Sequence, residues 1–209
     1  MKNPWLKIPA RDYEAHMALP EVAQSQALSR LMASALAEYT PASLAVIGCT
    51  TGNGFEHINT MHTRRVVGVD INPSYLAILK NRFAGVIPGL ELFEADIAGT
   101  GFLIKPVSMV FAGLVFEYVD ALSALRNISQ CMVSDAILVT VLQLPSTESS
   151  PVTPTCYKSL ELLEPVMKLV PPSKFSDMCS CVGLQQIRTD IVTLKKGKSF
   201  FTGFYRKTI

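Results

Sequence analysis

Short apolar runs alternate with amphipathic segments along the first 145 residues of the chain. Five runs are expected to form strands, at 43–48, 65–71, 90–97, from 107 onward, and at 136–144. Most are apolar without strict alternation, as is typical of parallel strands covered on both faces, whereas 90–97 is more polar and is expected nearer an edge. Helical patterns lie around them at 21–39, 54–62, 72–84 and 121–132. This alternation predicts repeated βαβ units.

The pattern changes after residue 145. A Pro/Ser/Thr-rich loop leads into an apolar stretch at 152–170 that looks partly helical, although Pro165 should kink or split it. A helix is expected at 172–183, with Ser173 as its N-cap and Gly183 at its end. Two further strands are joined by the short sequence KKGK, so they must be antiparallel. The predicted fold is α/β, a doubly wound, mostly parallel seven-stranded sheet with a C-terminal antiparallel hairpin.

Composition narrows the class of protein. The 209 residues suit a single domain, and no run of 18 uncharged apolar residues suggests a membrane span. The first residues lack the apolar core of a secretory signal, so we interpret the protein as cytoplasmic. The five cysteines show no C-x-x-C spacing, which argues against a zinc site, and no metal is expected. With a net charge of +2, the basic run LKKGK is expected to be a solvated turn rather than a nucleic-acid surface.

A turn rich in small residues follows the first strand in LAVIGCTTGNGFEHI, residues 44–58. Gly48, Gly52 and Gly54 give the spacing G-x-x-x-G-x-G. Such a turn lets a ligand approach the backbone, and a helix N-terminus after it would offer free N–H groups. The spacing is neither that of a phosphate-binding P-loop nor the dinucleotide fingerprint.

Two carboxylates stand at the ends of the next two expected strands. Asp70 closes VVGVD and Asp96 closes EAD. An acidic side chain at such a position can accept hydrogen bonds from ribose hydroxyls. Ligands of open α/β sheets also bind at the carboxyl ends of strands. Either residue alone could be a helix cap, but together with the glycine turn they predict a nucleoside site.

These motifs resemble those of the class I S-adenosylmethionine-dependent methyltransferases, over about residues 44–145. The resemblance implies a Rossmann-like methyltransferase fold, S-adenosylmethionine as cofactor and S-adenosylhomocysteine as product. It also implies that the methionine part of the cofactor contacts the glycine turn and that the ribose hydroxyls bind Asp70. The adenine would then bind Asp96 and lie against two isoleucines. The implied cofactor-binding residues are Gly48, Cys49, Thr50, Gly52, Gly54, Asp70, Ile71, Asp96, Ile97, Ala112 and Gly113.

Two positions depart from the family pattern. Val46 stands where a carboxylate usually meets the methionine ammonium, and Thr50 replaces the middle glycine of the turn. An alternative is therefore a catalytically weak or inactive methyltransferase-like binding or scaffold protein. A third possibility, an NAD(P)-dependent oxidoreductase, is disfavoured by the glycine spacing and the antiparallel last strand.

The resemblance further implies an N-terminal helical lid at residues 1–40 over a cofactor-binding domain at 41–209. Tyr13 and His16 are three residues apart and share one helical face, so they are candidate catalytic residues or simply packing residues. We expect residues 1–19 to order when ligand binds. Glu117 is a candidate general base or a structural cap. The short chain and the apolar stretch at 152–170 favour a small-molecule acceptor, in a monomer or homodimer without nucleic acid or membrane partners.

Overall fold

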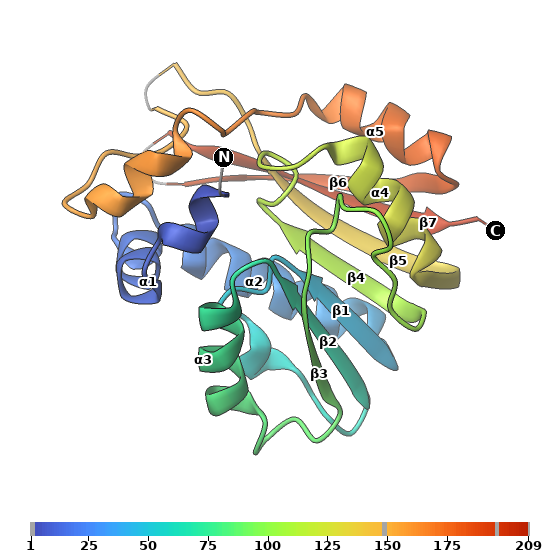
Figure 1. Cartoon of the computed structure of the whole chain (residues 1–209). Helices are drawn as coiled ribbons and strands as arrows, with labels where there is room; N and C mark the ends of the chain where they lie inside the picture. The colour runs from blue at the N-terminus through green and yellow to red at the C-terminus, as the bar shows by residue number, and fades with distance from the viewer. Residues whose placement is uncertain (1–2, 148–149, 195–196, 209) are drawn as a thin grey trace.

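A computed structural model describes residues 3–147, 150–194 and 197–208, and shows one twisted sheet between two layers of helices (Figure 1). Within these residues the sheet has seven strands in the order β3-β2-β1-β4-β5-β7-β6. The first five strands pair in parallel, and β7 lies antiparallel between β5 and β6. The strands are β1 (Ser43–Ile47), β2 (Arg65–Asp70), β3 (Leu90–Glu94), β4 (Val107–Gly113), β5 (Met132–Gln143), β6 (Leu184–Thr193) and β7 (Ser199–Lys207). The predicted fold class is confirmed, including β3 at an edge and the antiparallel hairpin.

The helices divide between the two faces of the sheet (Figure 1). Alternate residues of the same strand enter opposite cores, as the period of two in a strand requires: Leu44 and Val46 face one cluster, Ala45 and Ile47 the other. The first core is covered by α1 (Ala10–Ala18), α2 (Gln24–Tyr39) and α3 (Pro73–Phe83), and the second by α4 (Ala121–Gln130) and α5 (Pro172–Cys181). In the described part of the chain there are also three short 3₁₀ helices, η1 (Pro4–Lys7), η2 (Phe55–His57) and η3 (Lys158–Leu163).

Two helix predictions are wrong. The segment 54–62 forms only the single turn η2. Gly54 has a left-handed backbone at φ +89°, and the Asn59 side-chain oxygen accepts the Met61 N–H in a turn, so the chain cannot continue as a helix. The long helix expected after the glycine turn is therefore absent, and with it the expected helix N-terminus. Ser173 is not a cap either: Pro171 is the N-cap of α5 and Pro172 starts the helix.

Other boundaries follow local chemistry closely. Asn72 caps α3 by accepting the Ser74 N–H at 3.0 Å, with Pro73 at the first helical position. The segment 157–170 is split as Pro165 predicts, since η3 ends before it. The expected 21–39 helix begins late, at Gln24. Parts of three predicted segments (the lid, the loop after β5 and the KKGK turn) lie outside the described residues, at 1–2, 148–149 and 195–196. No helix of the described chain has the length and apolarity to cross a membrane.

Candidate functional site

A cavity of roughly 1080 Å³, counting the space open to solvent, follows the carboxyl edge of the sheet. It begins above β3 and β2, crosses β1 and β4, where the direction of strand order reverses, and ends above β5 and β7. Crevices at such a reversal are where open α/β sheets bind ligands. The part of the cavity above β2 and β3 is called the β2–β3 end, and the part above β5 and β7 is called the β5–β7 end.

The turn after β1 is held by the tip of β2. The N–H groups of Gly48 and Cys49 donate to the Val69 carbonyl at 2.9 and 3.1 Å. Thr50 N–H donates to Asp70 Oδ2 at 2.8 Å, which fixes Thr50 in a left-handed conformation at φ +47°. A β-branched residue is strained at such an angle. The turn is thus built around the Asp70 carboxylate.

Asp70 itself is buried and keeps capacity for a ligand. Its Oδ1 accepts the Asn72 N–H at 2.9 Å, and the Ile71 N–H also acts on it. A carboxylate has about four lone-pair sites, so the N–H groups of Thr50, Ile71 and Asn72 leave it able to accept a further hydrogen bond. Burial raises the pKa of Asp70 above its usual value, although these N–H groups oppose the change. A hydroxyl donor in the cavity would satisfy this carboxylate.

The β2–β3 end gathers most of the residues expected to meet a nucleoside. Seven of the predicted cofactor residues line the cavity, namely Gly48, Thr50, Asp70, Ile71, Asp96, Ile97 and Gly113. Asp96 is exposed, and its Oδ1 accepts the Ala98 N–H at 2.9 Å. This end of the cavity thus combines two carboxylates, one buried and one exposed, with two isoleucines.

Four other predicted residues do not line the cavity, namely Cys49, Gly52, Gly54 and Ala112. Their positions serve packing instead. Both glycines have positive φ, and a Cβ would approach the Phe83 ring at Gly52 and the Met32 sulfur at Gly54. Cys49 and Ala112 are buried in the cores. These four residues therefore pack within the glycine turn and β4, and they do not form part of the cavity wall.

The N-terminal segment forms a cover over the cavity, to which Trp5, Tyr13 and His16 contribute side chains. The Trp5 ring stands edge-on to Tyr118, with 5.0 Å between centroids. Polar contacts tie the segment to α3 and its cap: Asn72 Nδ2 and the Tyr75 hydroxyl each donate to a backbone carbonyl of the cover at 2.9 Å. Residues 3–18 are thus folded against the domain.

Glu14 makes a second attachment of this cover. Its carboxylate accepts hydrogen bonds from the Thr51 hydroxyl and the Arg82 guanidinium. These partners hold the pKa of Glu14 below its usual value, Arg82 foremost. Helix α1 is therefore linked both to the glycine turn and to α3.

The two candidate catalytic residues of the cover differ in protonation. Burial raises the pKa of Tyr13 to about 12, with a hydrogen bond involving Thr50 opposing the change, so the phenol keeps its proton at neutral pH. Burial and the nearby Lys198 charge lower the pKa of His16, so the imidazole is neutral there. Its Nδ1 pairs with the Thr155 hydroxyl at 2.9 Å. Tyr13 can donate a hydrogen bond in the cavity, and His16 can accept a proton.

Glu117, the third candidate, does not line the cavity. Its side chain is only 1% exposed, and Oε1 accepts the Gln143 N–H at 2.7 Å. Burial raises the pKa of Glu117 to about 7, and Oε2 has no hydrogen-bond partner within the described chain. Through this hydrogen bond the carboxyl group fixes the end of β5.

The β5–β7 end contains polar residues that sequence reasoning missed. Gln24 Nε2 donates to Gln143 Oε1 at 3.2 Å, and Gln143 Nε2 donates to the Pro151 carbonyl at 3.0 Å. Lys198 Nζ donates to the same carbonyl at 2.8 Å. Lys198 is only 4% exposed, so the expectation that the whole basic run is a solvated turn is wrong at this residue. Its position immediately before an apolar strand was the available signal.

Apolar residues complete that end of the cavity. Val152, Leu160, Leu163 and Met167 line it, all from the apolar stretch at 152–170. The combination of an apolar wall with a few polar groups is typical of small-molecule sites.

Comparisons with known proteins agree with this geometry. Residues 45–140 match the family model described as methyltransferase domain. Among solved structures, an S-adenosylmethionine-dependent methyltransferase from Mesorhizobium loti has 15% identity and a TM-score of 0.61, over 78% of this chain and 90% of that one. Magnesium protoporphyrin IX methyltransferase from Synechocystis PCC 6803, with bound S-adenosylmethionine, has 13% identity and a TM-score of 0.65, over 88% and 80%.

A third similar structure is geranyl diphosphate C-methyltransferase from Streptomyces coelicolor A3(2), solved with Mg²⁺, geranyl diphosphate and S-adenosylhomocysteine. It has 11% identity and a TM-score of 0.64, over 86% of this chain and 77% of that one. No functionally curated protein sequence matches the chain. At these identities the structural likeness establishes the fold.

Proposed function

We propose that this chain, which belongs to the class I S-adenosylmethionine-dependent methyltransferase family, transfers a methyl group from S-adenosylmethionine to a small molecule. The observation that carries the proposal is the cavity at the carboxyl edge of the sheet, with Asp70 at the tip of β2 and an apolar compartment above β5 and β7. The first part suits a nucleoside and the second an organic acceptor. The covered compartment leaves little room for a macromolecular substrate.

The residues of the β2–β3 end fit the cofactor by their donor and acceptor chemistry. Asp70 would accept the ribose hydroxyls, for which it retains free lone pairs. Asp96 would accept the adenine amine, with Ile71 and Ile97 against the ring. Gly48, Thr50 and Gly113 would adjoin the methionine part, while Cys49, Gly52, Gly54 and Ala112 would shape the backbone without contact.

The chemistry that bound S-adenosylmethionine would supply is an activated sulfonium methyl, which would pass to the acceptor by in-line displacement with S-adenosylhomocysteine as the leaving group. The chain's own contribution is alignment, which in favourable cases supplies about 7–11 kcal/mol of the effect. The cover of residues 3–18 would exclude water, and the protonated Tyr13 would orient a ligand by donating a hydrogen bond. Neutral His16 would accept a proton from an acceptor that must lose one. Glu117 would act only through the backbone of Gln143.

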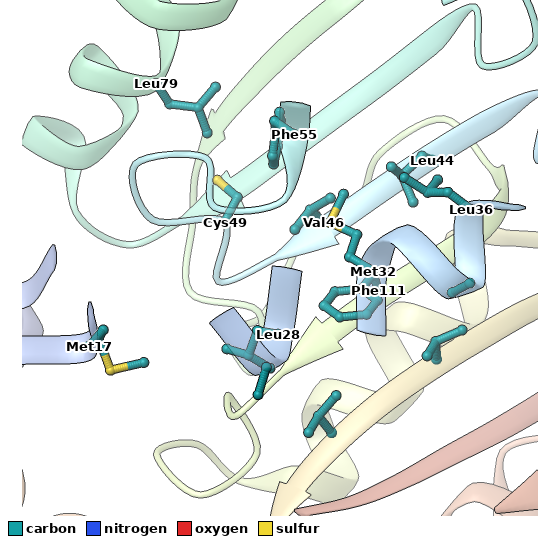
Figure 2. Close-up of a cluster of buried hydrophobic side chains, with 14 of the residues drawn as sticks. Met17, Leu28, Met32, Leu36, Leu44, Val46, Cys49, Phe55, Leu79 and Phe111 are labelled. Atoms are coloured by element: carbon teal, nitrogen blue, oxygen red, sulfur yellow. The ribbon is translucent and has the colours of Figure 1, made fainter. Parts of the chain in front are cut away.

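One observation favours the alternative of a binding or scaffold protein. Val46 is 5% exposed and belongs to the same apolar cluster as Met32 and Phe111 (Figure 2), so this position offers no partner to a methionine ammonium. A protein without cofactor affinity should show no thermal stabilisation by S-adenosylhomocysteine. A binding protein should gain about 1.4 kcal/mol at a tenfold excess over Kd.

Calorimetric titration with S-adenosylhomocysteine tests the proposal most directly. Asp70→Asn should weaken binding by about tenfold to a hundredfold, because a charged acceptor of hydrogen bonds is lost. The matched control is Asp177→Asn, an exposed aspartate on α5, which should bind like the wild type. Unchanged affinity in Asp70→Asn, or no binding by the wild type, would overturn the site. Turnover of a labelled methyl donor with a metabolite panel then separates enzyme from scaffold.

A further inference from the structure

The β5–β7 end of the cavity holds a buried ammonium with unused donors. An ammonium has three N–H groups, and within the described chain Lys198 uses one of them, on the Pro151 carbonyl. Because Lys198 is a lining residue, the remaining donors have the cavity as their available space. A buried charge with so little compensation is costly, and such charges are normally paired.

No carboxylate in the part of the chain that the structure describes forms an ion pair with Lys198. His16 is the titratable group on which the Lys198 charge acts, and it is neutral at neutral pH, so it adds no second charge. The Glu21 charge also acts on His16, but Glu21 forms no ion pair with Lys198 in the described chain. Glu117 is turned toward the backbone of Gln143, and the elements β5 and η3 present Gln143, Leu160 and Leu163 to the cavity. The compartment therefore carries a single positive charge.

Two independent features show that a polar ligand group would find partners beside this charge. Thr153 lines the cavity, and its hydroxyl is buried and has no hydrogen-bond partner within the described residues. His16 forms its hydrogen bond through Nδ1, and no described residue bonds to Nε2. An unpartnered buried hydroxyl in a native structure calls for an explanation such as a bound ligand.

We propose that the methyl acceptor is an apolar molecule bearing a carboxylate, which binds the Lys198 ammonium at the β5–β7 end of the cavity. This inference rests on the proposed function and names its substrate class. A carboxylate matches one positive charge with one neutral donor, the Thr153 hydroxyl, and leaves His16 Nε2 to accept a proton, whereas a phosphate monoester would favour a cluster of cationic groups. The apolar body of the acceptor would pack on Leu160, Leu163 and Met167.

The location of Lys198 separates acceptor from cofactor. Lys198 precedes β7, and Asp70 ends β2 on the far side of β1, β4 and β5. Loss of the ammonium should therefore change acceptor binding and leave binding of S-adenosylhomocysteine near its original strength. This difference makes the inference testable apart from the proposed function.

The test uses matched pairs of probes that differ only in charge: octanoate with octanamide, and cinnamate with cinnamamide. Binding is measured by calorimetry on the full chain with saturating S-adenosylhomocysteine. The wild type should prefer each carboxylate that binds over its amide by about tenfold to a hundredfold, as expected for a charge-assisted hydrogen bond. Lys198→Met should lose this preference, Lys198→Arg should retain part of it, and the exposed control Lys174→Met should bind like the wild type.

Several results would overturn the inference. One is equal binding of acid and amide, and another is an undiminished preference in Lys198→Met. A third is failure of every acid to bind at millimolar concentration, and a fourth is Lys198-dependent binding of octyl phosphate alone. A wild type that does not bind S-adenosylhomocysteine would instead overturn the proposed function, and the acid and amide titrations can still be made without it.

Discussion

Replacing Lys198 by methionine should stabilise the protein, because the ammonium is buried at a cost. Burial lowers the pKa of Lys198 from 10.5 to about 8. At 1.36 kcal/mol per pKa unit, this difference corresponds to about 3 kcal/mol by which folding disfavours the charged form. Methionine has a similar length and no charge, but it gives up the hydrogen bond to Pro151. We therefore expect Lys198→Met to raise the free energy of unfolding by about 1–3 kcal/mol at pH 7.

The sign of the pH dependence follows from the lowered pKa. Below about pH 8 Lys198 is charged in both the folded and the unfolded chain, so the whole penalty is present. Between about 8 and 10.5 the unfolded chain binds more protons, and the wild type gains stability relative to Lys198→Met as pH rises. His16, the titratable group on which the Lys198 charge acts, stays neutral over this window.

Urea unfolding of both proteins at pH 7, 8, 9 and 10 measures this difference. Taking the difference between them cancels the contributions of tyrosines and cysteines that titrate in the same range. The advantage of Lys198→Met should shrink as pH rises, while Lys174→Met should match the wild type at every pH. A variant that is less stable than the wild type at pH 7, or a difference that does not change with pH, would refute the assignment of a buried, uncompensated ammonium.

Three further predictions concern the turn and the cover. The Thr50→Gly variant should have an unfolding free energy about 1 kcal/mol higher than that of Thr50→Ala, because both lose the hydroxyl and only glycine tolerates the left-handed backbone. Equal stabilities of the two variants in chemical denaturation would show that the backbone at residue 50 is not strained. Val46→Glu should lower the unfolding free energy by at least about 2 kcal/mol without tightening S-adenosylmethionine, and a calorimetric gain in affinity would show that the cluster opens to the ligand. Glu14→Ala should speed hydrogen exchange of residues 10–18 by a few-fold, because a partly exposed ion pair is lost, and S-adenosylhomocysteine should slow this exchange. The control is Glu161→Ala, which removes an exposed ion pair elsewhere. Unchanged exchange in Glu14→Ala would mean that the other contacts hold the cover without this ion pair.

The fold could be predicted because each strand carries its own signal. The apolar runs around Val46 and Val67 mark strands buried on both faces, and the short connection before Lys198 permits only an antiparallel pair. The helix expected at 54–62 failed because periodicity does not report backbone handedness. Gly54 and the Asn59 turn redirect the chain where the apolar spacing alone would continue a helix.

The β2–β3 end of the site was also accessible from sequence, since a carboxylate that follows a parallel strand must lie at the carboxyl edge. Asp70 and Asp96 meet that condition. The orientation of a side chain at that edge was not accessible. Glu117 follows β4 in the same way, yet its carboxyl group turns to the Gln143 backbone and stays out of the cavity.

Lys198 shows why the polar residues at the β5–β7 end of the cavity could not be predicted from the sequence. Each parallel strand ends at the edge of the sheet where the cavity lies. Candidate site residues are therefore expected at the carboxyl ends of strands. Strand β7 is antiparallel and lies between β5 and β6, with Phe200 opposite Gln143, so the residue that precedes it reaches the same edge. A residue that looks like part of an exposed basic turn is thereby buried, with its ammonium on the Pro151 carbonyl and close enough to His16 that burial and this charge together lower the pKa of the imidazole. Within the described chain, the sheet order places the Asp70 and Asp96 carboxylates at one end of the cavity and the Lys198 ammonium at the other, which is the polarity that the proposed cofactor and the proposed carboxylate-bearing acceptor require.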